Sequence, residues 1–181
     1  MALAREDLKN FQARVAERLK VAREQEVGAS WLAVAIDGMN CLLPLSHANE
    51  VMPVSPVLPV PYVKTWFYGA INARGRIYGV VDLATYLAVE AKQSIPNRDK
   101  AWSIADCSLV GLNADLSMNC VLLVNKVMGL RNISSFDQSL PSKENAPNYF
   151  GTRYQDSAGA TWQEVNLQHL ARSTGFLSIS V

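Results

Sequence analysis

Apolar residues at helical spacing mark the N-terminal part of the chain. Between residues 5 and 25 they recur three or four positions apart, as Leu8, Phe11, Val15, Leu19 and Ala22. Charged residues alternate between them, and no Gly or Pro occurs before Gly28. This pattern predicts an amphipathic helix within residues 1–28 that ends at Gly28. Because its apolar stripe is narrow, we expect it to pack on the rest of the chain or on a partner.

After Gly28 the pattern changes to short apolar segments separated by turn residues. Those with the length and composition of strands are 31–37, 40–45, 67–73, 76–83, 107–114, 119–127 and 160–167. The turns near Gly38 and Gly75 are tight enough for two β-hairpins. Without the helical crossovers of a parallel sheet, the pattern favours small closed barrels. Short helices are expected at 83–89 and 166–172.

Three further segments read as connections. Residues 52–63 are rich in proline, which excludes a central strand and favours an extended path over the surface. Residues 139–151 form a second long polar loop. The polar stretch 91–101 is expected to join two lobes.

Composition narrows the class of protein. The chain has 181 residues, 49% of them hydrophobic, and a formal net charge of +1 without a basic run, so a nucleic-acid partner is not expected. Its three cysteines form no CxxC pair and lie in apolar runs, which predicts buried free thiols in a reducing cytosol. The chain shows neither an apolar signal core nor a run near the ~20 residues of a membrane span. We therefore expect a cytoplasmic protein without membrane insertion.

Motifs for catalysis and cofactor binding are absent from the sequence. It contains no GxGxxG, no GxxxxGK[ST], no GxSxG and no SxxK, and neither histidine has a metal-ligand neighbour at the usual spacing. We expect no enzyme, no cofactor and no metal site. An enzyme with an unrecognised site would have a deep pocket with convergent polar groups, whereas an adaptor would have a shallow apolar groove with charged rims.

The stretch 69–83, GAINARGRIYGVVDL, places an arginine in a tight turn. Gly75 accepts the positive φ that such a reversal needs, so Arg74 beside it should project into solvent. Glu50 is expected where an earlier strand ends, and its carboxylate could meet Arg74 if the proline-rich loop returns along the same barrel. An exposed pair contributes only about 0–1 kcal/mol to stability. At an interface the same charges would fix register and partner choice.

These stretches resemble the CheW-like chemotaxis coupling domains, and among them the PilI-like proteins of type IV pilus (twitching) signalling. The matching pieces are WLAVAIDGMNCLLPLSHANEVM, VPYVKTWFYGAINARGRIYGVVDL, NCVLLVNKVMGLRNI and TWQEVNLQHLA, which cover roughly residues 30–172 in order. The most specific part is the turn Asn72–Gly75 followed by Asp82 and Leu83. Ala73, Gly79 and Asn125 depart from the family's pattern.

The resemblance implies a mainly β fold of two small five-stranded, SH3-like barrels that share a hydrophobic core. The CheW-like domain would cover residues 29–181, with lobes at about 29–95 and 101–175, preceded by the helix of 1–28. It also implies a non-catalytic adaptor that links the regulatory domain of a CheA-like histidine kinase to the tip of a methyl-accepting chemoreceptor. The implied protein-binding residues are Glu50 and Arg74, with Ala48, Val51 and Asn72 completing the surface.

One alternative from another class stays open. A small β-barrel can bind single-stranded nucleic acid, or another small ligand, through exposed aromatic side chains. Trp66, Phe67, Tyr68 and Tyr78 cluster around the signature turn and could form such a platform. The near-neutral charge of the chain argues against this alternative.

Overall fold

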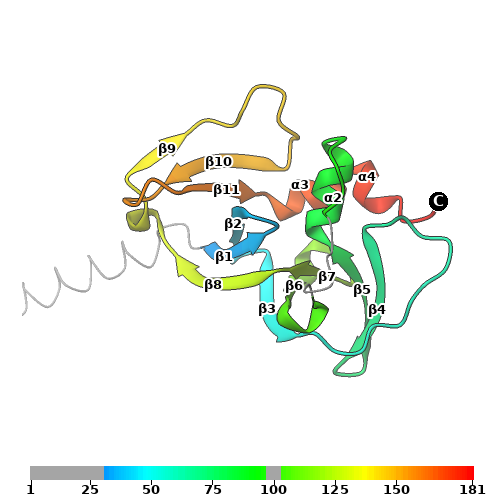
Figure 1. The fold of residues 1–181 in the computed structure, drawn as a ribbon. Coiled ribbons are helices and arrows are strands. Elements are labelled where there is room, and N and C mark those ends of the chain that lie inside the picture. The colour runs from blue at the N-terminus through cyan, green and yellow to red at the C-terminus, as the bar shows by residue number, and fades with distance from the viewer. Residues whose placement is uncertain (1–30, 97–102) are drawn as a thin grey trace, which may run out of the picture.

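The computed structural model describes residues 31–96 and 103–181, which form two β-sheets with short helices (Figure 1). The helix expected over residues 1–28 lies outside the described residues. Within the described part, the chain is mainly β, as the sequence predicts.

The first sheet has six strands in the order β8-β1-β2-β11-β10-β9. The strands are β1 (Trp31–Ile36), β2 (Met39–Pro44), β8 (Lys126–Arg131), β9 (Gln138–Leu140), β10 (Phe150–Gln155) and β11 (Thr161–Val165). All neighbours are antiparallel except β2 and β11, which run parallel.

The second sheet has five strands in the order β3-β6-β7-β5-β4, with β5 and β7 parallel. The strands are β3 (Ala48–Pro53), β4 (Phe67–Ala73), β5 (Arg76–Asp82), β6 (Ser108–Leu112) and β7 (Cys120–Val124).

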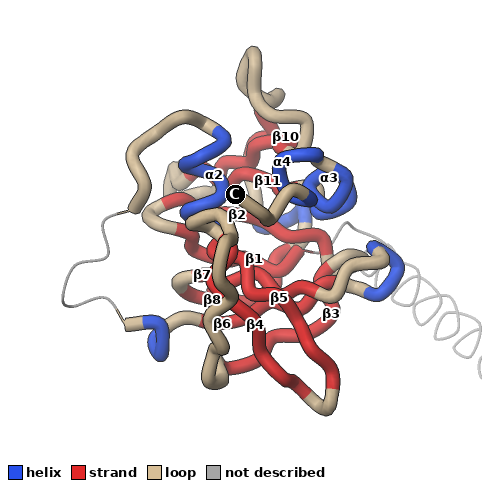
Figure 2. The backbone as a smooth tube through the Cα atoms, turned by 90° about the vertical axis from the view of Figure 1, so that its right-hand side faces the viewer, coloured by secondary structure: helices blue, strands red, loops and turns tan. Residues whose placement is uncertain are grey.

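The helices are α2 (Leu83–Glu90), α3 (Leu167–Arg172) and α4 (Thr174–Leu177). The 3-10 turns are η1 (Ile104–Asp106), η2 (Ala114–Leu116) and η3 (Ile133–Ser135). Figure 2 shows α2, α3 and α4 gathered on one side of the strands.

Several expectations about the elements are corrected. The sheets hold six and five strands among the described residues, not five each. The expected strand over 119–127 is divided at Asn125 into β7 and β8, and β3, β9 and β10 occur in stretches that lack a continuous apolar run. Each sheet also takes strands from both expected lobes, 29–95 and 101–175. The lobe boundaries therefore do not coincide with the sheets, and the division into domains stays a prediction.

Both expected hairpins form, and the same backbone geometry makes each one. The turn residues Asp37 and Gly38 between β1 and β2 have φ of 46° and 79°. Arg74 and Gly75 between β4 and β5 have φ of 51° and 78°. Two consecutive positive φ values define the two-residue turn whose twist matches that of paired strands. Glycine at the second position makes this conformation inexpensive.

Buried side chains form three clusters. The largest includes residues of both sheets together with α2, α3 and α4, for example Val34, Leu122, Leu83 and Phe176. A second, mostly aliphatic cluster belongs to the five-stranded sheet, and a third, largely aromatic cluster belongs to the six-stranded sheet. The two sheets thus each have an interior of their own and share the main core.

Candidate protein-interaction site

The turn between β4 and β5 presents Arg74 to solvent. Its side chain is 84% exposed. The Asn72 side chain fixes the turn, because its Oδ1 accepts a hydrogen bond of 3.1 Å from the Gly75 backbone N–H. Asn72 is itself exposed at the end of β4. The arginine is therefore displayed from a defined backbone conformation.

Glu50 and Arg74 form an ion pair, as the sequence suggests. Arg74 Nη1 lies 2.8 Å from Glu50 Oε2, and the Glu50 side chain is 24% exposed. The expectation that Glu50 stands where a strand ends is corrected, because Glu50 lies within β3 and pairs with Gly111 of β6. Since β3 is one edge of the five-stranded sheet and Arg74 follows the strand at the other edge, the pair bridges the two edges.

The chain itself also links these two edges. After β3, the backbone of Leu58 exchanges two hydrogen bonds of 2.8 Å with Ala70 of β4. A Cβ at Gly69 would overlap the carbonyl oxygen of Leu58 and lie 2.7 Å from a methyl carbon of Val57. Only glycine permits this close approach at a φ of 147°. The proline-rich loop therefore returns along β4, and its bridge to Ala70 links the two edges of the sheet through the chain itself.

Glycine also makes room for the glutamate. Gly111 lies opposite Glu50, and a Cβ there would stand 3.2 Å from Glu50 Cγ and 3.8 Å from Met52 Cε. Met52 packs against the interior cluster of the five-stranded sheet. Because Glu50 and Met52 share this side of the strand, the glutamate lies at the mouth of the barrel and reaches across it to Arg74. Sequence reasoning missed Gly111, whose only signal is a glycine inside an apolar run.

The other residues that the resemblance implies divide into exposed and buried ones. Val51 is 47% exposed and Ile77, the partner of Asn72 in the hairpin, is 60% exposed. Ala48, by contrast, is 7% exposed and belongs to the main core. The side chain of Ala48 is thus not part of the exposed surface. We call Val51, Asn72, Arg74 and Ile77, together with Glu50, the ion-pair surface.

Asp82 has a structural place just beyond this hairpin. It caps α2, with its carboxylate accepting hydrogen bonds from the Thr85 N–H at 3.3 Å and the Thr85 hydroxyl at 2.8 Å. An aspartate at this position satisfies a backbone N–H of the first turn that would otherwise lack a partner within the helix.

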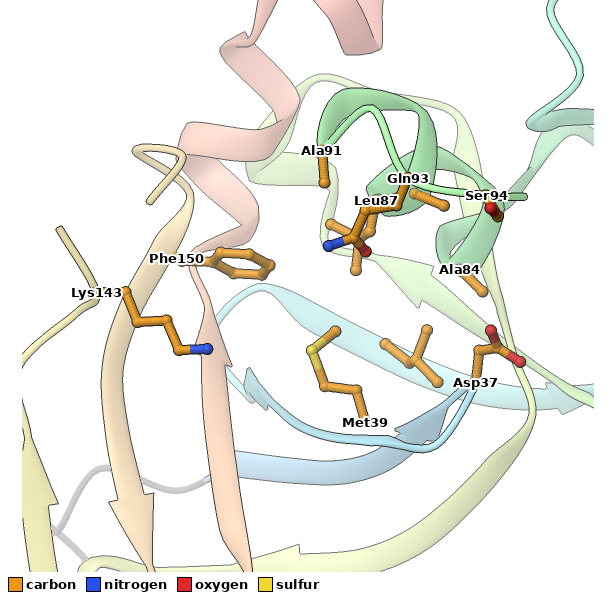
Figure 3. Close-up of a pocket in the computed structure, with 11 residues that line it drawn as sticks. Asp37, Met39, Ala84, Leu87, Ala91, Gln93, Ser94, Lys143 and Phe150 are labelled. Carbon is orange, nitrogen blue, oxygen red and sulfur yellow. The ribbon is translucent and has the colours of Figure 1, made fainter. Parts of the chain in front are cut away.

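A groove runs between α2 and the β1–β2 hairpin (Figure 3). Its volume is about 320 Å³. Met39, Leu87 and Phe150 supply apolar surface, and Asp37 and Lys143 stand at its sides. Gln93 and Ser94 add polar groups to the lining, so the groove is apolar in its middle with polar and charged residues around it.

The aromatic platform needed for nucleic-acid binding is not displayed. Trp66 is buried and stacks on Phe176, while Phe67 and Tyr78 pack against the core clusters. Of the four aromatic residues near the signature turn, only Tyr68 is among the exposed large apolar side chains. Base stacking needs an accessible ring face, so this geometry disfavours the alternative.

The three cysteines are buried, as expected, and form no disulfide with one another. Burial raises the pKa of Cys41 and of Cys120 from 9.0 to about 12. Thiols of this kind stay protonated and unreactive at neutral pH.

Within residues 31–96 and 103–181, no group of three or more His, Cys, Asp or Glu side chains is placed to hold a metal ion. Over the same residues, no helix has the length and apolar character needed to cross a bilayer.

The described residues thus form two β-sheets around a shared core, with an exposed arginine on one sheet and a mainly apolar groove beside α2. The chain belongs to the CheW-like domain family, whose model matches residues 30–174. This is a family of non-catalytic scaffolds, so the expectation of no enzyme is confirmed.

Two known proteins resemble the chain along most of its length. It is 26% identical to protein PilI of Pseudomonas aeruginosa over 164 residues, which cover 87% of this chain and 85% of that protein. The fold is similar to that of the scaffolding protein TtCheW of Thermoanaerobacter tengcongensis, with a TM-score of 0.61, 16% identity and coverage of 82% of this chain and 96% of that one.

Proposed function

We propose that this protein is a cytoplasmic adaptor that couples the regulatory domain of a CheA-like histidine kinase to the tip of a methyl-accepting chemoreceptor. CheW-like domains couple CheA kinases to chemoreceptors, and the likeness to PilI favours a chemosensory system of type IV pilus (twitching) motility. The two partners of this particular chain are part of the proposal.

The ion-pair surface is the proposed contact. The observation that supports it most is the display of Arg74, 84% exposed and held by Glu50 at 2.8 Å in a fixed turn. An arginine whose position is already fixed loses little side-chain entropy when a partner binds it. The exposed apolar side chain of Ile77, in the same hairpin as Arg74, would supply desolvated area beside the charge.

Stability alone does not account for the pair. Because Arg74 is so exposed, its ion pair contributes no more than about 1 kcal/mol to folding. A charge pair at the rim of an interface acts mainly on partner choice and association rate. A single contact of this size would be modest in affinity and would gain strength from the multivalency of a receptor array.

The decisive experiment is a calorimetric titration of the full chain with the regulatory domain of the CheA-like kinase from the same cell. Binding with a dissociation constant on the order of micromolar, about −8 kcal/mol, is expected for the wild type. If Arg74 contacts the kinase, Arg74→Glu weakens this binding at least about tenfold. Retained binding would assign Arg74 to the receptor side, and no binding by the wild type would contradict the kinase partner.

Two matched variants separate contact from fold. Arg172→Glu reverses the same charge on the exposed surface of α3, far along the chain, and should bind like the wild type. The exchange variant Glu50→Arg with Arg74→Glu keeps an ion pair across the barrel mouth but inverts the charges. If this double variant folds normally yet fails to bind, Arg74 contacts the partner directly and does not act by stabilising the five-stranded sheet.

A further inference from the structure

Exposed apolar side chains surround the point where the chain enters β1. Leu32 pairs with Leu43 on one side and with Leu130 of β8 on the other. Leu32 and Leu43 are buried in the main core, whereas Leu130 is 67% exposed. The row of leucines that forms the core thus continues onto the edge strand and ends in solvent.

Further apolar residues lie near the same point. Trp31, the first described residue, pairs with Arg131 of β8 and with Pro44 of β2. Leu45 follows Pro44, Leu130 precedes Arg131, and Ile133 stands two residues beyond it. Leu45, Leu130 and Ile133 are exposed large apolar side chains, and so is Met128 of β8. We call these four residues the β8 patch. Single exposed apolar residues are ordinary, but several around one point indicate a surface that another element covers.

We propose that the N-terminal segment of this same chain, residues 5–25, covers the β8 patch as an amphipathic helix. The sequence pattern predicts that helix, with an apolar stripe that has no partner of its own. The helix would lay this stripe against Met128, Leu130 and Ile133 and leave its charged residues in solvent. The inference concerns a contact within the chain and does not depend on the proposed kinase or receptor.

Chain length and position favour this occupant. Residues 26–30 separate the expected helix from Trp31 and can span about 17 Å when extended. Neighbouring strands lie only about 4.8 Å apart, so β8 is within easy reach of Trp31. The stripe from Leu8 to Ala22 would be about 21 Å long in a helix. β8 spans about 10 Å from Met128 to Arg131 at strand spacing, and Ile133 of η3 extends the patch beyond the strand, so the stripe is long enough to cover it.

Hydrogen exchange of the full chain alone in buffer tests the contact. We expect amides within residues 8–22 to exchange at least about tenfold more slowly than in an open chain. Leu130→Asp should remove that protection, because a carboxylate would be placed under the apolar stripe. Ile77→Asp makes the same change at a similarly exposed residue of the five-stranded sheet and should leave the protection intact.

A second variant, changed on the other side of the proposed contact, controls for the possibility that Leu130→Asp disturbs the folding of the sheet. Phe11→Asp with Leu19→Asp changes only the N-terminal segment and should speed exchange of amides in residues 126–133. No protection in the wild type, or protection that survives Leu130→Asp, would overturn the proposal. So would unchanged exchange of β8 in the second variant. Protection that grows over an about hundredfold rise in protein concentration would also overturn it, because a second copy would then be the occupant.

Discussion

The two sheets cover interiors of different chemistry. In the six-stranded sheet the interior is aromatic, with Trp31, Tyr154, Trp162 and Phe136 in mutual contact. In the five-stranded sheet the interior is mainly aliphatic, built from Ile71, Val80, Leu109, Val121 and Leu123. Aliphatic side chains need no polar partner, whereas a buried indole N–H does.

The charged residues near the two interiors have different partners for this reason. In the six-stranded sheet, Glu164 accepts a 2.9 Å hydrogen bond from Trp31 Nε1, and Asp156 accepts one of 2.9 Å from Trp162 Nε1. The Arg131 guanidinium lies 5.3 Å from the Trp162 ring centre. These charged groups bind the buried tryptophans of the six-stranded sheet and so contribute to its own packing. In the five-stranded sheet the Glu50–Arg74 pair stays accessible to solvent, so its charges are available to the proposed partner.

The largest effect should come from the backbone closure of the five-stranded sheet. Gly69→Ala would force a side chain into the Leu58 carbonyl at a φ of 147° and should lower the free energy of unfolding by about 4 kcal/mol or more. Gly38→Ala is the matched change in the six-stranded sheet, where φ is 79° but no atom lies within 4 Å. It should cost only about 1 kcal/mol. Equal losses in urea unfolding would contradict the close approach.

Alkaline pH should destabilise both sheets together. Cys41 in β2 and Cys120 in β7 both lie in the shared core, where burial raises their pKa from 9.0 to about 12. Above pH 9 the unfolded chain releases these protons while the folded chain retains them, so the stability present below pH 9 is lost as the pH rises. At about pH 10.5 the loss should be on the order of 2 kcal/mol per thiol.

Urea unfolding at several pH values measures this loss. The variant with Cys41→Ala and Cys120→Ala should be less stable at neutral pH but should show a flatter dependence above pH 9, so the difference from the wild type should shrink as the pH rises. Burial also raises the pKa of Tyr86 and Tyr149, which contribute in the same direction above their ordinary value of 10.0. Two separate transitions would show that the sheets do not share one cooperative core.

A smaller effect is expected from the polar bonds of the aromatic interior. Trp31→Phe removes the indole donor and leaves Glu164 Oε1 without that hydrogen bond, which should cost about 2 kcal/mol. Glu164→Gln keeps an oxygen acceptor and should cost clearly less. Thermal unfolding of the two variants compares them. A loss in Glu164→Gln as large as in Trp31→Phe would show that the charge, not the hydrogen bond, matters.

The smallest effect on stability should come from the ion pair. A double-mutant cycle of Glu50→Gln and Arg74→Gln should give a coupling energy below about 1 kcal/mol, since Arg74 is 84% exposed. Chemical unfolding at low and high salt checks this, because the coupling should decrease with salt. A coupling of several kcal/mol would mean that the pair holds the barrel closed, and the contrast between the two sheets would then be weaker.

The parts of the fold that could be predicted from sequence are those with a local signal. The hairpin of β4 and β5 was predictable because apolar runs flank Arg74 and Gly75. β10 was missed because Gly151, Thr152 and Arg153 interrupt any apolar run and the strand is only half-buried. β3 was missed because Asn49 and Glu50 precede a proline-rich stretch. Strand order was beyond reach, since the parallel pairing of β2 with β11 depends on tertiary packing.

For the candidate site, the sequence predicted the Glu50–Arg74 ion pair but not the backbone geometry that brings the two residues together. Arg74 could be placed from its turn, and the meeting with Glu50 follows from the return of the loop at Leu58. That Ala48 would face the core could not be read from a short strand without regular alternation. The role of Gly111 was equally hidden, because a glycine in a strand has several possible causes.

The pairing of β1 and β2 with the last strands affects the synthesis of the protein. Trp31 and its partner Glu164 are 133 residues apart. On the ribosome, the first hairpin emerges long before the strands that complete its sheet, and its apolar faces stay uncovered in the meantime. We therefore expect the six-stranded sheet to complete its pairing only after β10 and β11 have been made, near the end of translation. A transcript that ends early would yield a product for proteases and not a shortened scaffold.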